Sequence, residues 1–299
     1  MYLITGAGGG VGGVSREVVE SLLDSGAPVR AMVHRDDDRA DALRALGADV
    51  FVGDLTRARD IDEAISGVTR MFFSMSVSAD YLLATAEVCA AALERGHLEV
   101  IVNMSQMTVS QMTLTSTGES NQHRLHYLAE HVLNWSRLPV IHIRPTIFAE
   151  NPLFTVLAAR TIKDRRVLAL PFGSGSTSPI AAADVARVVT TLLRDPAGRI
   201  GSVYHLTGPQ VLDLHGLAEQ YSRALERPIT AEDEPYDVWR REVLEPVGLP
   251  EHVQQHIATM ARLHREGRYH RSTDDVERIT GQPAQSFAQY VASHRDLFD

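Results

Sequence analysis

The sequence predicts an α/β protein built on a doubly wound parallel sheet, in which helices cover both faces of the sheet. Short apolar runs alternate with longer helical patterns between residues 2 and 144. A glycine cluster directly follows the first apolar run, where a sharp turn from strand into helix is needed. Because strands and helices alternate, each strand reaches the next through a crossover, and crossovers make neighbouring strands parallel.

The expected elements of this half follow one another without a break. The first helix carries Val11, Val14, Val18 and Leu22 on one stripe, and Gly26 stands where a C-terminal cap belongs. The expected strands span residues 2–5, 29–33, 49–52, 71–75, 99–104 and 139–144. The later helices of this half span residues 39–46, 60–65, 79–95 and 119–137.

Beyond Asn151 the pattern predicts a smaller, mostly helical substrate region. Helical periodicity over residues 236–268 predicts a cap above the carboxyl edge of the sheet. We therefore divide the chain into residues 1–151 and 152–299, with about 180–207 returning to the first domain. The other expected elements are helices at residues 152–162 and 182–193, and strands at residues 167–170, 203–206 and 227–230.

The composition is that of a globular protein and excludes several classes. The net charge of −9 disfavours binding to nucleic acid, because the phosphate backbone is negative. The single cysteine, Cys89, excludes an internal disulfide and a cysteine-based zinc site. The chain has no apolar run of about 20 residues to span a membrane, and the expected strand at Tyr2 leaves no room for a signal peptide. We expect a cytoplasmic protein.

The glycine cluster predicts a dinucleotide site. Gly6, Gly9 and Gly12 form G-x-x-G-x-x-G between the first strand and the first helix, the context that makes the motif informative. Glycines let backbone N–H groups approach a pyrophosphate, and the helix N-terminus favours its charge. The alternative is a flexible glycine loop without a ligand. The contacts expected from this turn come from Thr5, Gly6, Gly9, Gly10, Val11 and Gly12.

The end of the second strand indicates which dinucleotide binds. An arginine there accommodates a 2′-phosphate, whereas an acidic residue hydrogen-bonds a 2′-hydroxyl. Arg35 therefore favours NADP(H) over NAD(H). The alternative is a solvated surface arginine, and Asp36, Asp37 and Asp38 argue for NAD(H), since a carboxylate turned inward would repel the phosphate.

Other strand ends supply further cofactor contacts. Asp54 and Leu55 follow the third strand, where an adenine ring would rest; alternatively, Asp54 caps the next turn. Ser74 and Met75 end the fourth strand, and Pro145 follows the sixth. Because the carboxyl ends of parallel strands share one edge of the sheet, we expect all of these residues along the cofactor.

Further motifs continue along nearly the whole chain. They are Ile4-Thr5-Gly6-Ala7-x-Gly9-x-x-Gly12, Gly53-Asp54-Leu55, His126-x-x-x-Glu130, Ile143-Arg144-Pro145, Asn151, Pro179-Ile180-x-x-x-Asp184-Val185-Ala186 and Tyr204-His205-Leu206-Thr207-Gly208-Pro209. With these motifs the chain resembles the NmrA-like family of atypical short-chain dehydrogenase/reductases. The resemblance implies an NAD(P)-binding Rossmann domain and a smaller C-terminal substrate region. Some members look like NADPH-dependent reductases of quinones or dyes, and others like redox-sensing regulators without turnover.

The lysine content excludes the main mechanism of the wider superfamily, which uses Tyr-x-x-x-Lys. Lys163 is the only lysine, and Ala159 stands four residues before it. The missing pair argues against alcohol oxidation and sugar-nucleotide epimerisation. It favours hydride transfer to an activated acceptor such as a quinone, an imine or a conjugated carbonyl.

His126 and Ser105 are the candidate catalytic residues. Alignment on Arg144 places His126 near the position of the superfamily's lysine, where a weak acid would suit the reduction. In the superfamily a serine at the place of Ser105 hydrogen-bonds the reacting carbonyl. The alternatives for His126 are a structural pair with Glu130 and a metal site that includes His123, which we do not expect because the family uses no metal.

Met107, Phe148 and Trp239 are expected to line the substrate pocket, although such residues are more often plain core. Our first hypothesis is an NADPH-dependent reductase of a small activated acceptor. The alternative is a non-enzymatic NADP(H)-binding redox sensor that binds a partner protein. A small molecule is the expected partner, and a homodimer is the assembly we consider.

Overall fold

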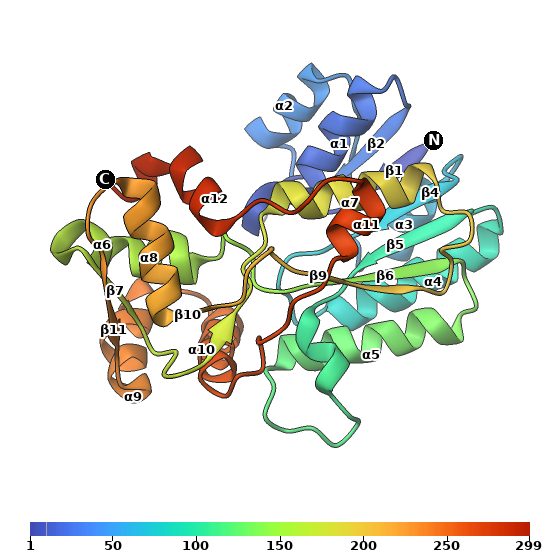
Figure 1. The fold of residues 1–299 in the computed structure, drawn as a ribbon. Coiled ribbons are helices and arrows are strands. Elements are labelled where there is room, and N and C mark those ends of the chain that lie inside the picture. Colours follow the sequence, from blue (N-terminus) through green and yellow to red (C-terminus); the bar gives the residue numbers. More distant parts are fainter. Residues whose placement is uncertain (10) are drawn as a thin grey trace.

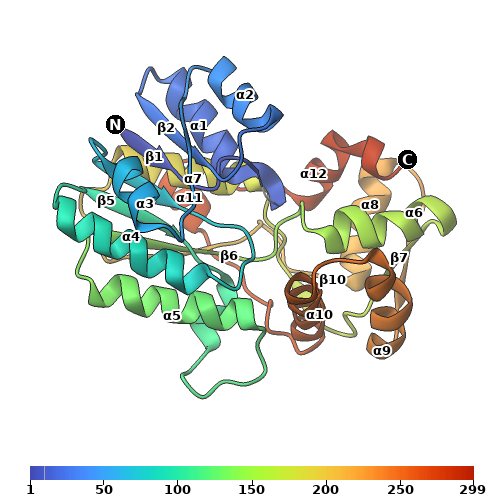
Figure 2. The ribbon, with the colours of Figure 1, turned by 180° about the vertical axis from the view of Figure 1, so that it is seen from behind.

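The computed structural model describes residues 1–9 and 11–299. The strands of its main sheet are β1 (Tyr2–Ile4), β2 (Val29–Val33), β3 (Asp49–Val52), β4 (Arg70–Phe73), β5 (Val100–Met104), β6 (Val140–Pro145) and β9 (Val203–Leu206). They form one parallel sheet in the order β3-β2-β1-β4-β5-β6-β9. Helices cover both faces of this sheet (Figures 1 and 2), which confirms the predicted doubly wound fold.

The strand order reverses beside β1, the strand that leads into the glycine cluster. Tyr2 pairs with Val29 of β2 on one side and with Arg70 of β4 on the other. In open α/β sheets, ligands bind at such a reversal, outside the carboxyl ends of the strands. The motifs that follow β1, β2, β3 and β4 therefore converge on one region.

Two helical layers bury the sheet. One layer contains α1 (Val14–Asp24), α2 (Asp38–Ala45), α7 (Ala182–Arg194) and α11 (Asp275–Thr280), and the other contains α3 (Ala58–Ile65), α4 (Tyr81–Arg95) and α5 (Asn121–Trp135). α1 buries Val14, Val18 and Leu22, three members of the predicted stripe. In the part of the chain that the structure describes, no helix has both the length and the apolar character needed to cross a membrane.

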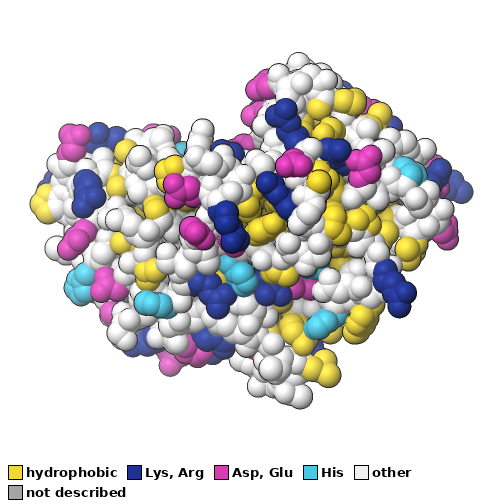
Figure 3. Space-filling model, turned by 45° about the vertical axis from the view of Figure 1, so that its right-hand side comes forward, with side chains coloured by type: hydrophobic (Ala, Val, Ile, Leu, Met, Phe, Trp, Pro, Cys, Tyr) yellow, Lys and Arg dark blue, Asp and Glu magenta, His cyan; other side chains and the backbone are white. Residues whose placement is uncertain are grey.

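After β6 the chain forms a smaller body beside the sheet (Figure 2). Basic and acidic side chains are interspersed over the face of the molecule shown in Figure 3. The helices of the smaller body are α6 (Ala159–Arg165), α8 (Leu214–Leu225), α9 (Tyr236–Trp239), α10 (Glu251–Arg265) and α12 (Phe287–Ser293). Its strands are β7 (Val167–Leu170), β8 (Ser176–Thr177), β10 (Leu212–Asp213) and β11 (Thr230–Asp233). β7 and β11 pair in parallel, and β8 and β10 pair antiparallel. A separate core fills this body, and α10 packs against α5 of the sheet.

Two expectations for the second half need correction. The strand expected at residues 227–230 lies at 230–233, because Pro228 has no N–H to donate and the Arg227 guanidinium binds the Phe298 carbonyl. The helical stretch expected over residues 236–268 consists of separate segments. Gly248, at a φ of 72°, and Pro250 interrupt it before α10 begins.

Candidate active site

The turn after β1 forms a cradle of main chain. Gly6 has a φ of +66°, and a Cβ there would lie 2.8 Å from the Ser74 carbonyl oxygen, which is too close for any side chain. Gly9 has a φ of +96°, and nothing lies within 4 Å of its Cβ position. Gly6, Gly8 and Gly9 line one cavity. A pyrophosphate therefore has room to approach the backbone, as a bound dinucleotide requires.

Two other residues predicted in this turn lie behind the cradle. A Cβ at Gly12 would lie 2.6 Å from a side chain of α7, so this glycine allows the turn to pack against that helix. The buried Thr5 hydroxyl donates to the Ser74 carbonyl at 2.8 Å and accepts the Ser74 N–H at 2.9 Å, which joins the ends of β1 and β4. Gly10 and the side chain of Val11 lie outside the described residues.

A cavity of about 580 Å³ extends from the glycine turn across the ends of β2 and β3. Arg35, Asp54, Leu55 and Met75 line it, together with Arg39, which the sequence analysis did not single out. The Arg35 side chain forms no ion pair with any residue that the structure describes, so its guanidinium is available to a ligand. This cavity brings most of the predicted cofactor residues together.

The aspartates beside Arg35 are engaged with the next helix. Asp36 pairs with Arg44 at 2.7 Å. Asp37 caps α2 by accepting the Arg39 N–H at 3.0 Å, and it also pairs with the Arg39 guanidinium. These contacts hold two of the three carboxylates against α2, which weakens the argument from the sequence that they oppose a 2′-phosphate.

Asp54 performs the turn-capping role that was weighed against adenine binding. Its Oδ1 accepts the Thr56 N–H at 2.9 Å and the Thr56 hydroxyl at 2.7 Å. The hydrogen bond from the Thr56 backbone outweighs the effect of burial and lowers the pKa of Asp54. The Asp54 carboxylate is thus ionised, and its hydrogen bonds to Thr56 hold it in the wall of the cavity.

A second cavity, of about 390 Å³, adjoins the first and shares the lining residues Gly6, Met75 and Ser76 with it. The predicted residues that line it are Ser74, Met75, Ser105, Met107, His126, Pro145 and Phe148. Side chains of α10 close it from the smaller body. None of its described lining residues is Lys, Arg, Asp or Glu. A cavity with charged lining residues and a mostly apolar cavity therefore lie next to each other at the carboxyl edge of the sheet.

Trp239, which we expected in the substrate pocket, lies elsewhere. It is fully buried in the core of the smaller body, and its indole packs near Tyr236, with 6.3 Å between ring centroids. α9 directs this side chain into the core rather than toward the sheet. The interpretation of Trp239 as a pocket residue needs correction.

Ser105 belongs to a buried ion-pair network. Its hydroxyl donates to Glu130 of α5, and the Arg144 guanidinium of β6 binds both carboxylate oxygens, with Nε at 2.9 Å. Burial raises the pKa of Glu130, but the hydrogen bond and charge of Arg144 outweigh it and lower the pKa. Glu130 is therefore ionised, and its partners are Arg144 and Ser105 rather than His126.

His126 is held as a neutral ring. Gln122 Oε1 accepts the Ser78 N–H at 3.1 Å, so the amide nitrogen of Gln122 faces His126 Nε2, also at 3.1 Å. His126 Nε2 must therefore accept, and the proton sits on Nδ1, which is buried without a partner among the described residues. The centroid of the His126 ring lies 4.2 Å from the centroid of the Tyr81 ring. Burial, assisted by His256, lowers the pKa of His126 to about 3.

His256 of α10, which was not among the residues predicted for the site, lines the same cavity. Its Nδ1 lies 2.8 Å from the Ser120 hydroxyl, at the start of α5. Burial lowers the pKa of His256 to about 4. The available signal was its place on the apolar stripe of this helix, three residues after Val253 and four before Met260.

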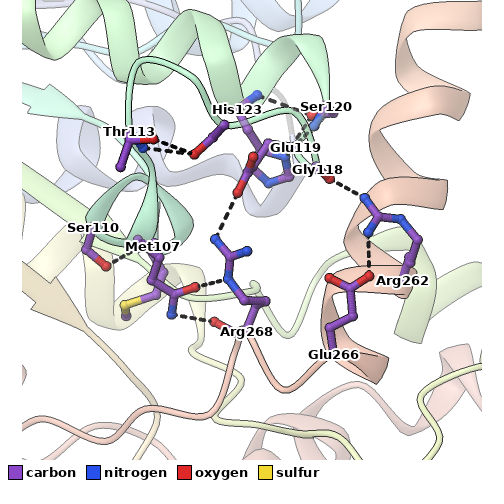
Figure 4. A network of polar contacts seen from close by, with 12 residues as sticks. Met107, Ser110, Thr113, Gly118, Glu119, Ser120, His123, Arg262, Glu266 and Arg268 are labelled. Carbon is purple, nitrogen blue, oxygen red and sulfur yellow. Dashed lines mark hydrogen bonds and ion pairs between the residues drawn. The ribbon is translucent and has the colours of Figure 1, made fainter.

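A network of polar contacts fixes α10 to the loop before α5 (Figure 4). Arg268 pairs with Glu119 at 2.8 Å and also contacts Gln111. Arg262 donates to the Gly118 carbonyl and pairs with Glu266. These contacts hold the helix that carries His256 against the segment that carries Ser120. Within residues 1–9 and 11–299, no group of three potential ligands is placed to bind a metal ion.

Comparison with known proteins places the chain in a nucleotide-binding family. A family model described as NAD(P)H-binding matches residues 9–196. The chain is 27% identical over 297 residues to an NAD(P)H azoreductase of Xenophilus azovorans, with 97% of each chain covered. It is 28% identical over 298 residues to a (4-alkanoyl-5-oxo-2,5-dihydrofuran-3-yl)methyl phosphate reductase of Streptomyces griseus, covering 100% of this chain and 99% of that one.

Solved structures share the fold over almost the whole chain. The NADPH-dependent quinone oxidoreductase QOR2 of Escherichia coli, complexed with NADPH, has a TM-score of 0.84 at 23% identity, covering 99% of this chain and 100% of that one. NmrA, a negative transcriptional regulator crystallised with NADP, has a TM-score of 0.78 at 17% identity, covering 97% of this chain and 94% of that one. The same fold therefore occurs in an enzyme and in a regulator.

Proposed function

Because the chain belongs to the NAD(P)H-binding family, we propose that it is an NADPH-dependent reductase of a small activated acceptor, such as a quinone, an imine or a conjugated carbonyl. The observation that carries the proposal is that the two cavities adjoin at the carboxyl edge of the sheet, where they share the lining residues Gly6, Met75 and Ser76. One offers a main-chain cradle and an unpaired arginine, and the other offers an apolar chamber. An open chamber beside the nicotinamide end favours an enzyme over a sensor, whose corresponding face would be closed.

The first cavity suits NADP(H). Gly6 and Gly9 would hold the pyrophosphate, with Gly10 and Val11 in the same turn, and Arg35 would bind the 2′-phosphate. Asp54 and Leu55 would border the adenine. Thr5 and Gly12 would position the cradle from behind. The nicotinamide half of the dinucleotide would lie along Ser74, Met75 and Pro145.

The bound dinucleotide would supply the hydride, and the chain's own residues would bind and orient the acceptor. We place Met107 and Phe148 against its apolar surface, and His126 and Ser105 beside the reacting group. Because the Ser105 hydroxyl donates its hydrogen to Glu130, Ser105 would accept a hydrogen bond from the bound molecule rather than donate one to a carbonyl. Water supplies the second proton, since neutral His126 keeps its Nδ1 proton at pH 7.

The acceptor named for the Streptomyces griseus relative bears a phosphate. No cationic side chain occurs among the described residues that line the second cavity, so no side-chain charge there would compensate that of a phosphate. We therefore propose an unphosphorylated acceptor for this chain.

A two-stage experiment tests the proposed function. The cofactor-free protein is titrated calorimetrically with NADPH and separately with NADH, and NADPH oxidation is then followed with quinones, imines and conjugated carbonyls. We expect tight binding of NADPH and turnover of at least one acceptor class. Binding without turnover on any of them would favour the alternative, a non-enzymatic NADP(H) sensor that binds a partner protein. Failure to bind either nucleotide would reject both functions.

Arg35→Ala should weaken NADPH binding about 10- to 100-fold and leave NADH binding nearly unchanged, because a hydrogen bond to a charged group contributes roughly 1.5–3 kcal/mol. Calorimetric dissociation constants for both nucleotides provide the measurement. Arg59→Ala is the matched control, since Arg59 is an exposed arginine that does not line either cavity. An equal loss for the two nucleotides would remove Arg35 from the 2′-phosphate site.

His126→Ala should lower kcat roughly tenfold while the Kd for NADPH changes less than about twofold, because the ring borders the acceptor rather than the phosphates. Steady-state kinetics and calorimetry measure the two quantities. His131→Ala is the control, because His131 stacks on Trp135 away from both cavities. Unchanged turnover would assign His126 a purely structural role.

A further inference from the structure

A carboxyl group lies directly behind the turn that would hold the phosphates of the cofactor. Glu150 lies in the segment after β6 and packs against Gly12, where a Cβ would lie 3.5 Å from both Cβ and Cδ of the glutamate. Its two carboxyl oxygens accept the Ala182 N–H, at 3.1 and 3.2 Å, where α7 begins. Glu150 thus joins the glycine turn to α7, although it is not among the described residues that line the two cavities.

Gly12 also borders the end of α1 that would meet the phosphates. Gly13 is the N-cap of α1, and it has no side chain to accept the first N–H groups of the helix. Such N–H groups, together with the positive end of the helix dipole, attract a bound phosphate. Because Glu150 packs on the residue next to this cap, a pyrophosphate at the turn would bring its negative charge close to the Glu150 carboxyl group.

The helices around Glu150 add negative charge rather than neutralise it. Glu17 lies in the first turn of α1, and its charge raises the pKa of Glu150. Asp184 lies in the first turn of α7, where it pairs with Arg187 at 2.8 Å and accepts the Gln285 N–H at 2.7 Å. The Arg187 guanidinium is therefore engaged by another carboxylate.

The smaller body faces Glu150 with two titratable groups, Tyr290 of α12 and His294 beyond it. Their rings stack with 4.4 Å between the centroids, and His294 Nδ1 lies 2.9 Å from the Tyr290 carbonyl oxygen. Burial raises the pKa of Glu150 to about 7, although the hydrogen bond from the Ala182 N–H and the charge of His294 both act to lower it. The half-buried carboxyl group can therefore take up or release a proton close to neutral pH.

We propose that Glu150 sets the affinity of the cofactor site through its charge. The neutral carboxyl group allows the phosphates to bind tightly, whereas the ionised carboxylate repels them, so that binding draws protons from solvent onto Glu150. This inference rests on the cofactor site of the proposed function but not on turnover, and it adds a residue that acts on the nucleotide from behind the glycine turn. Linkage makes the effect reciprocal, and the affinity for NADPH should fall as Glu150 loses its proton between pH 6.5 and pH 8.5.

The first test is a calorimetric titration with NADPH at pH 6.5 and at pH 8.5. Glu150→Gln keeps an oxygen that accepts the Ala182 N–H but never ionises, and Glu94→Gln makes the same change at an exposed position that lines neither cavity. At pH 6.5 we expect the wild type and both variants to bind NADPH within about twofold of one another. At pH 8.5 we expect Glu150→Gln to bind about 3- to 10-fold more tightly than the other two, the scale expected for like charges that interact across a partly hydrated turn.

Proton uptake gives a second measurement. The enthalpy of NADPH binding at pH 7.5 is compared in PIPES and in Tris, two buffers with different enthalpies of ionisation. On binding, we expect the wild type to take up roughly half a proton more than Glu150→Gln. The 2′-phosphate of NADPH is common to both titrations, so the difference belongs to Glu150. NADH, which has no 2′-phosphate, repeats the measurement on the wild type alone and does not depend on the folding of a variant.

The outcomes separate the inference from the function. The same pH dependence and proton uptake in the wild type and Glu150→Gln would overturn the inference and leave the cofactor site intact. An equal change of affinity at both pH values would also overturn it, because a purely structural role of Glu150 acts independently of its charge. If the linkage is observed but no acceptor is reduced, the reductase function fails and the inference stands. If neither NADPH nor NADH binds, the cofactor site and the inference fail together.

Discussion

Arg144→Met should lower the free energy of unfolding by about 3–5 kcal/mol, because it leaves Glu130 buried without its counter-ion. The side chains of Arg144 and Glu130 are only 16% and 6% exposed. Without the guanidinium, only His142 and the Ser105 hydrogen bond still oppose burial, so we expect the pKa of the Glu130 carboxyl to rise. Urea unfolding followed by circular dichroism at pH 7 measures the change.

Two controls make the Arg144 prediction specific. The double variant Glu130→Gln/Arg144→Met removes both charges and should recover part of the loss, which would show that the unpaired carboxylate is responsible. Arg16→Met breaks an exposed pair with Glu20 and should change the free energy of unfolding by less than about 1 kcal/mol. If Arg144→Met destabilises no more than Arg16→Met, the buried pair does not have the role that we assign to it.

Glu150→Gln should stabilise the protein at pH 8 by up to about 3 kcal/mol and have little effect at pH 4.5. Glu150 packs behind the glycine turn, and both carboxylate oxygens accept the Ala182 N–H that begins α7. Burial raises its pKa from 4.5 to about 7; the nearby Glu17 adds to this shift, and His294 opposes it. Tyr290 of α12 also lies within electrostatic range.

The direction in which stability changes with pH follows from proton binding to Glu150. Between pH 4.5 and 7 the folded chain keeps a proton on Glu150 that the unfolded chain has released, so stability falls as the pH rises through this window. A glutamine accepts the same N–H and never ionises, so its advantage over the wild type should grow across that range. Unfolding curves at several pH values measure it, with Glu94→Gln, an exposed position, as the control. Parallel pH profiles of wild type and variant would contradict the prediction.

The sequence predicts the strands best where hydrophobic alternation is bounded by turn residues. Residues 49–52, 167–170 and 203–206 form strands with the expected limits. By contrast, β8 and β10 contain two residues each, too few for a periodic pattern. Their pairing depends on a tertiary contact between segments that lie far apart in the sequence.

The same distinction applies to the site. Residues adjacent to strand ends, such as Gly6, Arg35 and Asp54, could be grouped from sequence because a parallel sheet brings its carboxyl ends together. Residues on helices could not be assigned to the site in this way, because helical periodicity identifies a buried stripe but not the part of the protein against which the stripe packs. Trp239 and His256 both lie on buried helical faces; one faces the core of the smaller body and the other the second cavity.

The chain's return to the main sheet has a consequence for biosynthesis. α7, β9 and α11 contribute Val188, Leu206 and Val276 to the same core as Ile4 and Val18. During translation, the first strand leaves the ribosome long before the helix that completes its core. The half of the chain that is made first therefore cannot reach its final packing until nearly all of the chain has been synthesised.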